Sequence, residues 1–249
     1  MCALPLEQEI EYPTSDGQPM AETTLHRVVM SDVIEALERR FAGTADVWVG
    51  GNLLLYYQKG DRNKSVAPDV LLAQGVAKRS RDTFLLWEEK VPALVFEITS
   101  RWTRREDTGS KKDLYERLGV AELVLFDPYG DYLKPRLQGY RLERGRYRQI
   151  ALNGDGSLDL RTAGVTVLPE GERLRLVDTA SGEKLLWNDE LEAARQAAED
   201  RAAAFEERSA AEAAARRAAE ERAAAAEERA QALAEELARL RTKMGKPSV

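Results

Sequence analysis

The last quarter of the chain most constrains what it can fold into. From Asp189 to Met244 the sequence has no glycine or proline and consists mostly of alanine, glutamate and arginine. These residues are strong helix formers. Repeated Glu-Glu-Arg triplets also allow salt bridges between residues three or four positions apart. The segment therefore predicts one long, continuous α-helix.

Three leucines near the end of this segment, Leu233, Leu237 and Leu240, keep the alternating spacing of four and three residues found in a coiled-coil seam. Before Leu233, the seam positions would mostly be alanines, and each alanine would bury little apolar surface area. Two interpretations remain, a coiled coil that forms homo-oligomers or a single exposed helix. We expect a homo-oligomer that forms through this helix.

The composition before residue 188 is mixed, with glycine, proline, aromatic and β-branched residues. We therefore predict a globular domain over residues 10–187 and an Ala/Glu/Arg-rich helical segment over 188–245.

Cys2 is the only cysteine, which excludes a disulfide framework. No apolar run is long enough to cross a membrane, and no secretory signal is visible, so we expect a cytoplasmic protein without a membrane partner. The net charge of -6 argues against a protein that coats nucleic acid.

Alternating apolar patterns before residue 188 predict an α/β fold, in which a mixed β-sheet is flanked by helices and followed by an antiparallel extension. The expected helices cover 22–41 and 107–118. The expected strands cover 47–49, 53–57, 70–73, 93–99 and 122–126, with a hairpin of 140–142 and 147–150.

Two carboxylates interrupt these apolar strands. Glu97 lies inside the run from Ala93 to Thr99, and Asp69 lies between a proline and the apolar start of another strand. A buried carboxylate is costly unless it is paired or binds a metal. Two of them on neighbouring strands can share a hard cation such as Mg²⁺. The alternatives are a turn or cap role for Asp69, and an edge position or an arginine partner for Glu97.

A lysine on the following helix completes this pattern. Lys111 shares a helix face with Leu114, Tyr115 and Leu118, and this face should pack on the sheet. An inward cation there could neutralise a phosphate or orient an attacking water. The alternative is a snorkelling lysine, or a structural ion pair with Asp107.

These segments resemble the bacterial Uma-two family of the PD-(D/E)XK restriction-endonuclease-like superfamily, over residues 10–175. The segments are Pro68-Asp69-Val70, Val95-Phe-Glu97-Ile-Thr-Ser100, Asp107 to Lys111, Tyr115 and Gly119-Val120-Ala-Glu122. The resemblance implies a restriction-endonuclease-like fold in which Asp69, Glu97 and Lys111 are catalytic, and in which Asp69 and Glu97 bind Mg²⁺ or Mn²⁺. The superfamily lysine follows the second acid by two residues, where this chain has Thr99. Family members of this kind supply the lysine from the next helix, and Lys111 matches that position.

Further residues could support such a site. The family's first helix often carries a histidine, which His26 resembles, and Glu22 lies one turn earlier on the same face. Either could complete the site, although His26 could equally be a packing residue. Phosphate contacts need basic residues. The candidates are Arg101, Arg104, Arg105 and Lys112, and the alternative for them is solvated surface charge.

The function expected from these observations is a Mg²⁺-dependent endonuclease that hydrolyses phosphodiester bonds in DNA. The alternative is a non-catalytic interaction or oligomerisation protein with a nuclease fold, acting through its C-terminal helix. A transposon- or defence-associated nuclease whose partner supplies DNA specificity is also open. The sequence has no phosphate-binding loop and no nucleophile elbow. Its single histidine argues against Ser-His-Asp or Cys-His catalysis.

Overall fold

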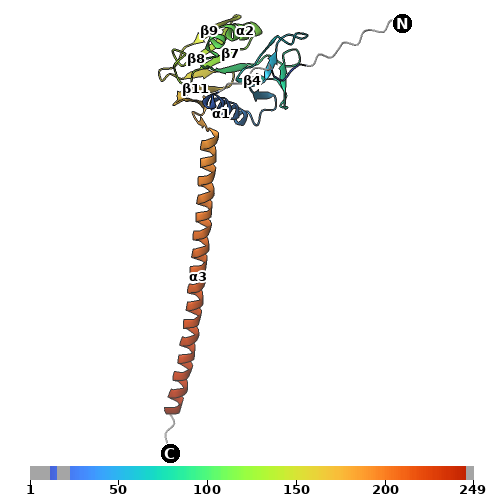
Figure 1. Cartoon of the computed structure of the whole chain (residues 1–249). Helices are drawn as coiled ribbons and strands as arrows, with labels where there is room; N and C mark the ends of the chain where they lie inside the picture. Colours follow the sequence, from blue (N-terminus) through green and yellow to red (C-terminus); the bar gives the residue numbers. More distant parts are fainter. Residues whose placement is uncertain (1–11, 16–22, 245–249) are drawn as a thin grey trace, which may run out of the picture. The chain divides into compact units, whose positions relative to one another are not determined.

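The computed structural model describes residues 12–15 and 23–244, and the chain divides after Asn188 into two compact units (Figure 1). The second unit contains α3 (Asn188–Met244), which covers the segment predicted as one helix. The elements of the first unit are α1 (Thr24–Arg40), β1 (Val47–Gly50), β2 (Leu54–Tyr56), β3 (Ser65–Val66), β4 (Val70–Gln74), β5 (Thr83–Leu85), β6 (Leu94–Ile98), η1 (Glu106–Ser110), α2 (Lys111–Leu118), β7 (Glu122–Phe126), β8 (Leu137–Glu143), β9 (Arg146–Ile150), β10 (Leu158–Leu160), β11 (Val165–Glu170), β12 (Arg173–Asp178) and β13 (Lys184–Leu185). No helix among the described residues is both long enough and apolar enough to cross a membrane.

A six-stranded sheet with the order β1-β4-β6-β7-β8-β9 forms the centre of the first unit. Strands β6 and β7 are parallel, and the other neighbours in this sheet are antiparallel. Parallel neighbours need a crossover connection, which η1 and α2 provide here. Strands β10 to β13 form a separate antiparallel sheet, and β3-β2-β5 forms a third. The predicted fold class, a mixed sheet flanked by helices, is confirmed.

The two faces of the central sheet carry different helices. Phe96 and Ile98 of β6 pack in one core with α1 and with β10 to β12. Val95, adjacent to Phe96 along the strand, packs in a second core with Tyr115 of α2. This follows from the alternation of side chains along a strand. Figure 1 shows α1 and α2 on opposite sides of the strands labelled β7 and β8.

The predicted helix over 107–118 differs in its first turns. Residues of η1 form a wider π-helical segment, in which the N–H of Lys111 donates to the carbonyl of Glu106. The α-helix α2 begins at Lys111 and ends at Leu118, and its C-cap Gly119 has a φ of 87°, in the left-handed region that favours glycine. A π-helical turn changes which residues share a face, but Asp107 still forms the predicted ion pair with Lys111, four residues later.

Strands β6 and β7 are buried along their whole length, and each contains one glutamate. Glu122 of β7 is a structural residue. Its carboxylate accepts hydrogen bonds from Arg141 Nε at 2.8 Å, from Thr162 N at 2.9 Å and Oγ1 at 2.6 Å, and from Arg161 N at 3.2 Å. It therefore joins β7 and β8 to the turn between β10 and β11.

The Glu122 cluster predicts a stability effect. Glu122→Ala leaves Arg141 and the buried donors of this turn without their acceptor, so we expect the free energy of unfolding to fall by about 3 kcal/mol. Urea denaturation followed by circular dichroism measures this change. The matched control is Glu143→Ala, at an exposed position of β8, for which we expect a change under about 0.5 kcal/mol. Equal effects of the two changes would contradict the structural role of Glu122.

Candidate active site

The ends of two antiparallel strands place Asp69 beside Glu97. Strands β4 and β6 pair Val70 with Phe96, and one further step of this register sets Asp69 opposite Glu97. The Asp69 carboxylate is fixed there, because its Oδ2 accepts a hydrogen bond of 2.6 Å from the backbone N–H of Ile98. The two predicted metal-ligating acids are therefore neighbours.

Helix α2 supplies two donors to the buried Glu97 carboxylate. Lys111 Nζ donates to Oε2 at 2.7 Å, and the Tyr115 hydroxyl donates to Oε1 at 2.5 Å. Lys111 and Tyr115 lie one helical turn apart, so they share a face. Both Glu97 and Tyr115 are almost fully buried, whereas the Lys111 side chain keeps 18% of its surface exposed. Lys111 thus reaches Glu97 from the side that contacts solvent.

The structure adds Asp107, which the sequence analysis treated only as an ion-pair partner of Lys111. Asp107 lies in η1, is 1% exposed, and has its Oδ1 3.3 Å from Lys111 Nζ. Neither of its carboxylate oxygens has a hydrogen-bond partner among the described residues. Its charge is therefore balanced by the ion pair with Lys111, whose ammonium group also contacts Glu97, and not by a set of well-aligned hydrogen bonds.

These charges perturb one another strongly. Burial raises the pKa of Glu97 to about 8; the carboxylates of Asp69 and Asp107 add to this rise, and Lys111 opposes it. Burial also raises the pKa of Asp107, against the effect of Lys111. For Lys111, burial acts to lower the pKa, but the attraction of Glu97, Asp107 and Asp69 outweighs it and raises the pKa above its ordinary value. These three acids therefore favour the charged form of Lys111.

Tyr115 is the other site residue that the sequence analysis did not single out. It matched the motif and looked like a core residue, because it falls on the apolar face of α2. Burial, together with the neighbouring Glu97 carboxylate, raises the pKa of its phenol well above the ordinary value. The phenol therefore stays protonated and serves as a hydrogen-bond donor to Glu97.

The opposite helix contributes His26. Its Nε2 lies 3.1 Å from Asp69 Oδ1, and its backbone N–H donates to the side chain of Thr23, the N-cap of α1. The structure thus brings His26 into contact with a predicted metal ligand. Glu22 lies outside the described residues.

Thr99 stands where the superfamily pattern has a lysine. It is 1% exposed, and its hydroxyl has no hydrogen-bond partner among the described residues. Thr99 is the first residue after β6, two positions from Glu97. The ammonium group that contacts Glu97 instead comes from Lys111 of α2, as the motif comparison predicted.

One hollow reaches Lys111, and another lies at the segment that follows β6. One has a volume of about 490 Å³ and is lined by Lys111 together with the following residues: Leu54, Tyr57, Ser65, Val66, Ala67, Glu106, Ser110, Leu114 and Arg117. The other has a volume of about 480 Å³ and is lined by Arg101, Trp102, Arg104, Arg105 and Tyr132. The first gives a ligand access to Lys111, and the second concentrates positive charge.

The basic residues proposed for phosphate contacts divide into two groups. Arg101, Arg104 and Arg105 lie together in the second hollow and are exposed. Lys112 does not line it. Its Nζ lies 4.3 Å from the centre of the Tyr140 ring, and the side chain is half-buried. The structure therefore supports the three arginines as one surface and separates Lys112 from them.

Among the described residues, no group of three or more His, Cys, Asp or Glu side chains forms a metal-ion cage. A metal site here would therefore have few protein ligands, as is common for Mg²⁺, which keeps several waters and takes one or two carboxylates. Asp69 and Glu97 fit this donor set. Asp107, paired with Lys111, is a third carboxylate in the same cluster.

Comparisons with known proteins agree with the motifs. The model of the Uma2 family, described as "Putative restriction endonuclease", matches residues 1–169. No curated protein matches the chain. One of the solved structures that match is the crystal structure of "a putative nuclease belonging to DUF820" from Anabaena variabilis, with 15% sequence identity, a TM-score of 0.43, and coverage of 58% of this chain and 76% of that chain. Because the family model matches more than half of the 249 residues, the chain belongs to the Uma2 family, as its motifs predict.

Proposed function

We propose that this chain is an endonuclease that hydrolyses phosphodiester bonds in DNA with the help of Mg²⁺ or Mn²⁺. The observation that carries the proposal is the contact of 2.7 Å between Lys111 and the buried Glu97, beside Asp69. The family description, restriction endonuclease, supports the same reaction class.

Asp69 and Glu97 would hold the metal ion through carboxylate oxygens. Three acids share one lysine in this cluster, and burial raises the pKa of Glu97 and Asp107, so a divalent cation would favour their ionised forms. It would also relieve the repulsion that helps to raise the pKa of Glu97. A bound metal stabilises charge on a phosphate and lowers the pKa of its bound water.

The chain's own residues would then position the reactants. Hydrolysis forms a bond from a water oxygen to phosphorus, breaks one ester bond, and moves a proton from the water to the leaving oxygen. Lys111 stays charged, because its pKa is raised, so it would neutralise the phosphate and not act as a base. Tyr115 and His26 would fix the orientation of Glu97 and Asp69, respectively.

DNA binding would use local charge, since the whole chain carries a net charge of -6. Arg101, Arg104 and Arg105 form an exposed cationic surface, with Trp102 beside them at 78% exposure. Arginines bind phosphate oxygens through a planar set of donors. Contacts between these arginines and phosphates would not distinguish one base sequence from another.

The first prediction of this proposal concerns cleavage. Glu97→Gln, Asp69→Asn and Lys111→Met should each lower the rate at which the protein cuts plasmid or single-stranded DNA by about 100-fold or more, because each removes a group from the reacting centre. Gel assays with Mg²⁺ or Mn²⁺ measure the rates. Circular dichroism establishes that each variant is folded.

The matched control is Lys112→Met, the same change at the next residue of α2, whose ammonium group lies over Tyr140. It should leave the rate within about threefold, because this ammonium group contacts the Tyr140 ring and forms no ion pair with Glu97 or Asp107. Absence of cleavage by the wild type, or equal loss in both lysine variants, would overturn the proposal in favour of a non-catalytic protein.

A second prediction separates metal binding from folding. Asp107→Asn removes a buried charge whose ionised form burial disfavours, so the metal-free variant should melt at the same temperature as the wild type or higher. Its affinity for Mn²⁺ should fall about 10-fold, through the loss of nearby negative charge. Calorimetry and thermal melts with and without EDTA measure both quantities. A lower melting temperature with unchanged Mn²⁺ affinity would show that Asp107 is purely structural.

A third prediction concerns the arginine surface. Arg104→Ala combined with Arg105→Ala should weaken DNA binding and lower the slope of log affinity against log salt by about one for each phosphate that is no longer bound. The control is Arg144→Ala with Arg148→Ala, which removes the same charge from exposed positions of the β8–β9 hairpin. Fluorescence anisotropy at several salt concentrations measures the slopes. Equal slopes for the two double variants would exclude a dedicated surface.

A further inference from the structure

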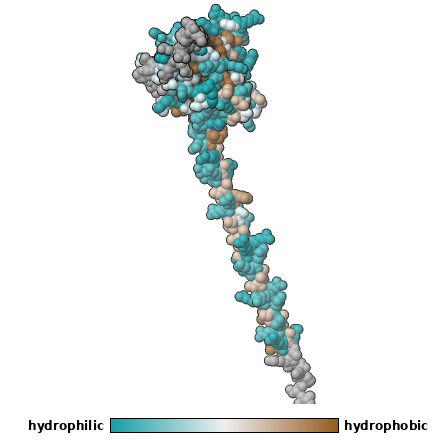
Figure 2. Space-filling model, turned by 90° about the vertical axis from the view of Figure 1, so that its right-hand side faces the viewer, coloured by the Kyte–Doolittle hydropathy of each residue, from teal (hydrophilic) through white to brown (hydrophobic). Residues whose placement is uncertain are grey.

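The large apolar side chains that α3 exposes follow one heptad frame. They are Leu191, Phe205, Leu233, Leu237 and Leu240. If Leu237 is assigned to position a, the other four all occupy position d, at separations that are multiples of the heptad length. Single apolar residues on a solvated helix have no reason to share one frame along its whole length. In Figure 2, hydrophobic patches alternate with hydrophilic ones along this helix.

The remaining core positions of this frame are mostly small. They are Ala198, Ala202, Ala219, Ala223, Ala226, Ala230 and Ser209, with Arg195, Glu212 and Arg216 as the charged exceptions. A seam of alanine lets two helices approach closely. It would leave a void in the wider core of three or more helices, and such voids are unfavourable. The seam therefore fits two strands.

The charged side chains that flank the seam have opposite signs on its two sides. Position g holds Arg201, Arg208, Arg222, Arg229 and Glu236, and position e holds Glu192, Glu199, Glu206, Glu220, Glu227 and Arg241. Arginine thus dominates one flank and glutamate the other. Near the C-terminal end both flanks change sign, at Glu236 and Arg241. Positions g and e therefore carry opposite charges even where the sign at each position reverses.

This pattern distinguishes the directions in which two copies could pair. In a parallel, in-register pair each g residue faces the e residue of the next heptad in the partner. The charged contacts are then Arg201 with Glu206, Arg222 with Glu227, and Glu236 with Arg241, and each remaining g–e contact from residue 194 to 234 includes an alanine. No like charges face each other. In an antiparallel pair g faces g and e faces e, which sets arginine mostly against arginine and glutamate mostly against glutamate.

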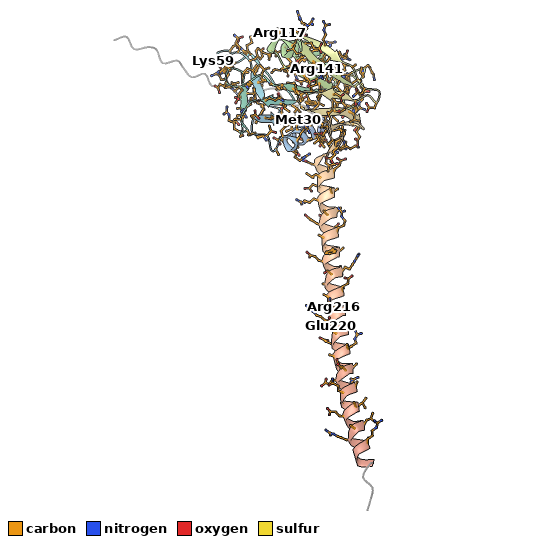
Figure 3. All side chains as sticks on the ribbon, turned by 180° about the vertical axis from the view of Figure 1, so that it is seen from behind. Met30, Lys59, Arg117, Arg141, Arg216 and Glu220 are labelled. Carbon is orange, nitrogen blue, oxygen red and sulfur yellow. The ribbon has the colours of Figure 1, made fainter. Side chains whose placement is uncertain are left out.

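We propose that α3 binds a second copy of this chain as a parallel, in-register, two-stranded coiled coil over residues 191–240. The charged core positions are compatible with this pairing. Arg195 and Arg216 each form an ion pair with the glutamate four residues later, at 3.5 and 3.0 Å, and Figure 3 labels Arg216 and Glu220 on α3. Polar residues at position a fix register and strand number at a cost in stability. The proposal does not depend on nuclease activity.

Cysteine cross-linking of the full chain tests direction and register. In a Cys2→Ser background, Ala198→Cys and Ala226→Cys place a thiol at two d positions far apart in α3. Each variant alone should form a disulfide-linked dimer under mild oxidation, because identical d residues face each other in a parallel pair. A mixture of the two should give no peptide that links position 198 to position 226 by mass spectrometry. The control Ala203→Cys, at position b, should cross-link far less.

Charge reversal tests the pairing rule. Arg201→Glu with Arg222→Glu should raise the dimer dissociation constant about 10-fold or more, as measured by sedimentation equilibrium, and addition of Glu206→Arg with Glu227→Arg should restore it. The control, Arg217→Glu with Arg239→Glu, makes the same charge change outside the e and g positions and should shift the constant less than about threefold. A wild type that is monomeric at every concentration, a larger assembly, or a 198–226 cross-link would each overturn the proposal.

Discussion

The burial of one carboxylate, Glu97, constrains the elements around it. It lies in β6 between β4 and β7, where an isolated charge would be strongly unfavourable. Helix α2 must therefore present Lys111 and Tyr115 on one face, at a position along β6 where both side chains reach the Glu97 carboxylate. The crossover between the parallel strands β6 and β7 determines this position. The packing of α2 against the sheet therefore also places the two donors to Glu97.

Two buried glutamates in neighbouring strands, Glu122 and Glu97, differ in how their carboxylate charge is compensated. Glu122 has an arginine, two backbone N–H groups and a hydroxyl as donors, so its charge is compensated within the fold. Glu97 shares one lysine with Asp107, and Asp107 has no hydrogen-bond partner among the described residues. Such a group is unfavourable for folding stability. The imbalance distinguishes the candidate active site from the structural network.

The sequence predicted the strands that carry Asp69 and Glu97, because a charge inside an apolar run is visible without a structure. Lys111 followed from helical phase, since α2 is regular from that residue onward. The spacing of four residues predicted the ion pair between Asp107 and Lys111. It did not predict that Asp107 is buried near Glu97, because that depends on how the crossover packs in space. Tyr115 was read as an apolar core residue, and its hydroxyl gains a role only from the position of Glu97 in space. Strand order and the separation of Lys112 from the arginines likewise depend on the packing of segments that are distant in sequence.

His26 and Lys111 approach the two acids from helices that cover opposite faces of the sheet. The short motifs around Asp69 and Glu97 are therefore not a transferable unit. A designer who moved only β4, β6 and α2 into another scaffold would leave behind the histidine that holds Asp69 from the α1 side. The smallest portable piece runs from α1 to β7, with the strand order β4-β6-β7 intact.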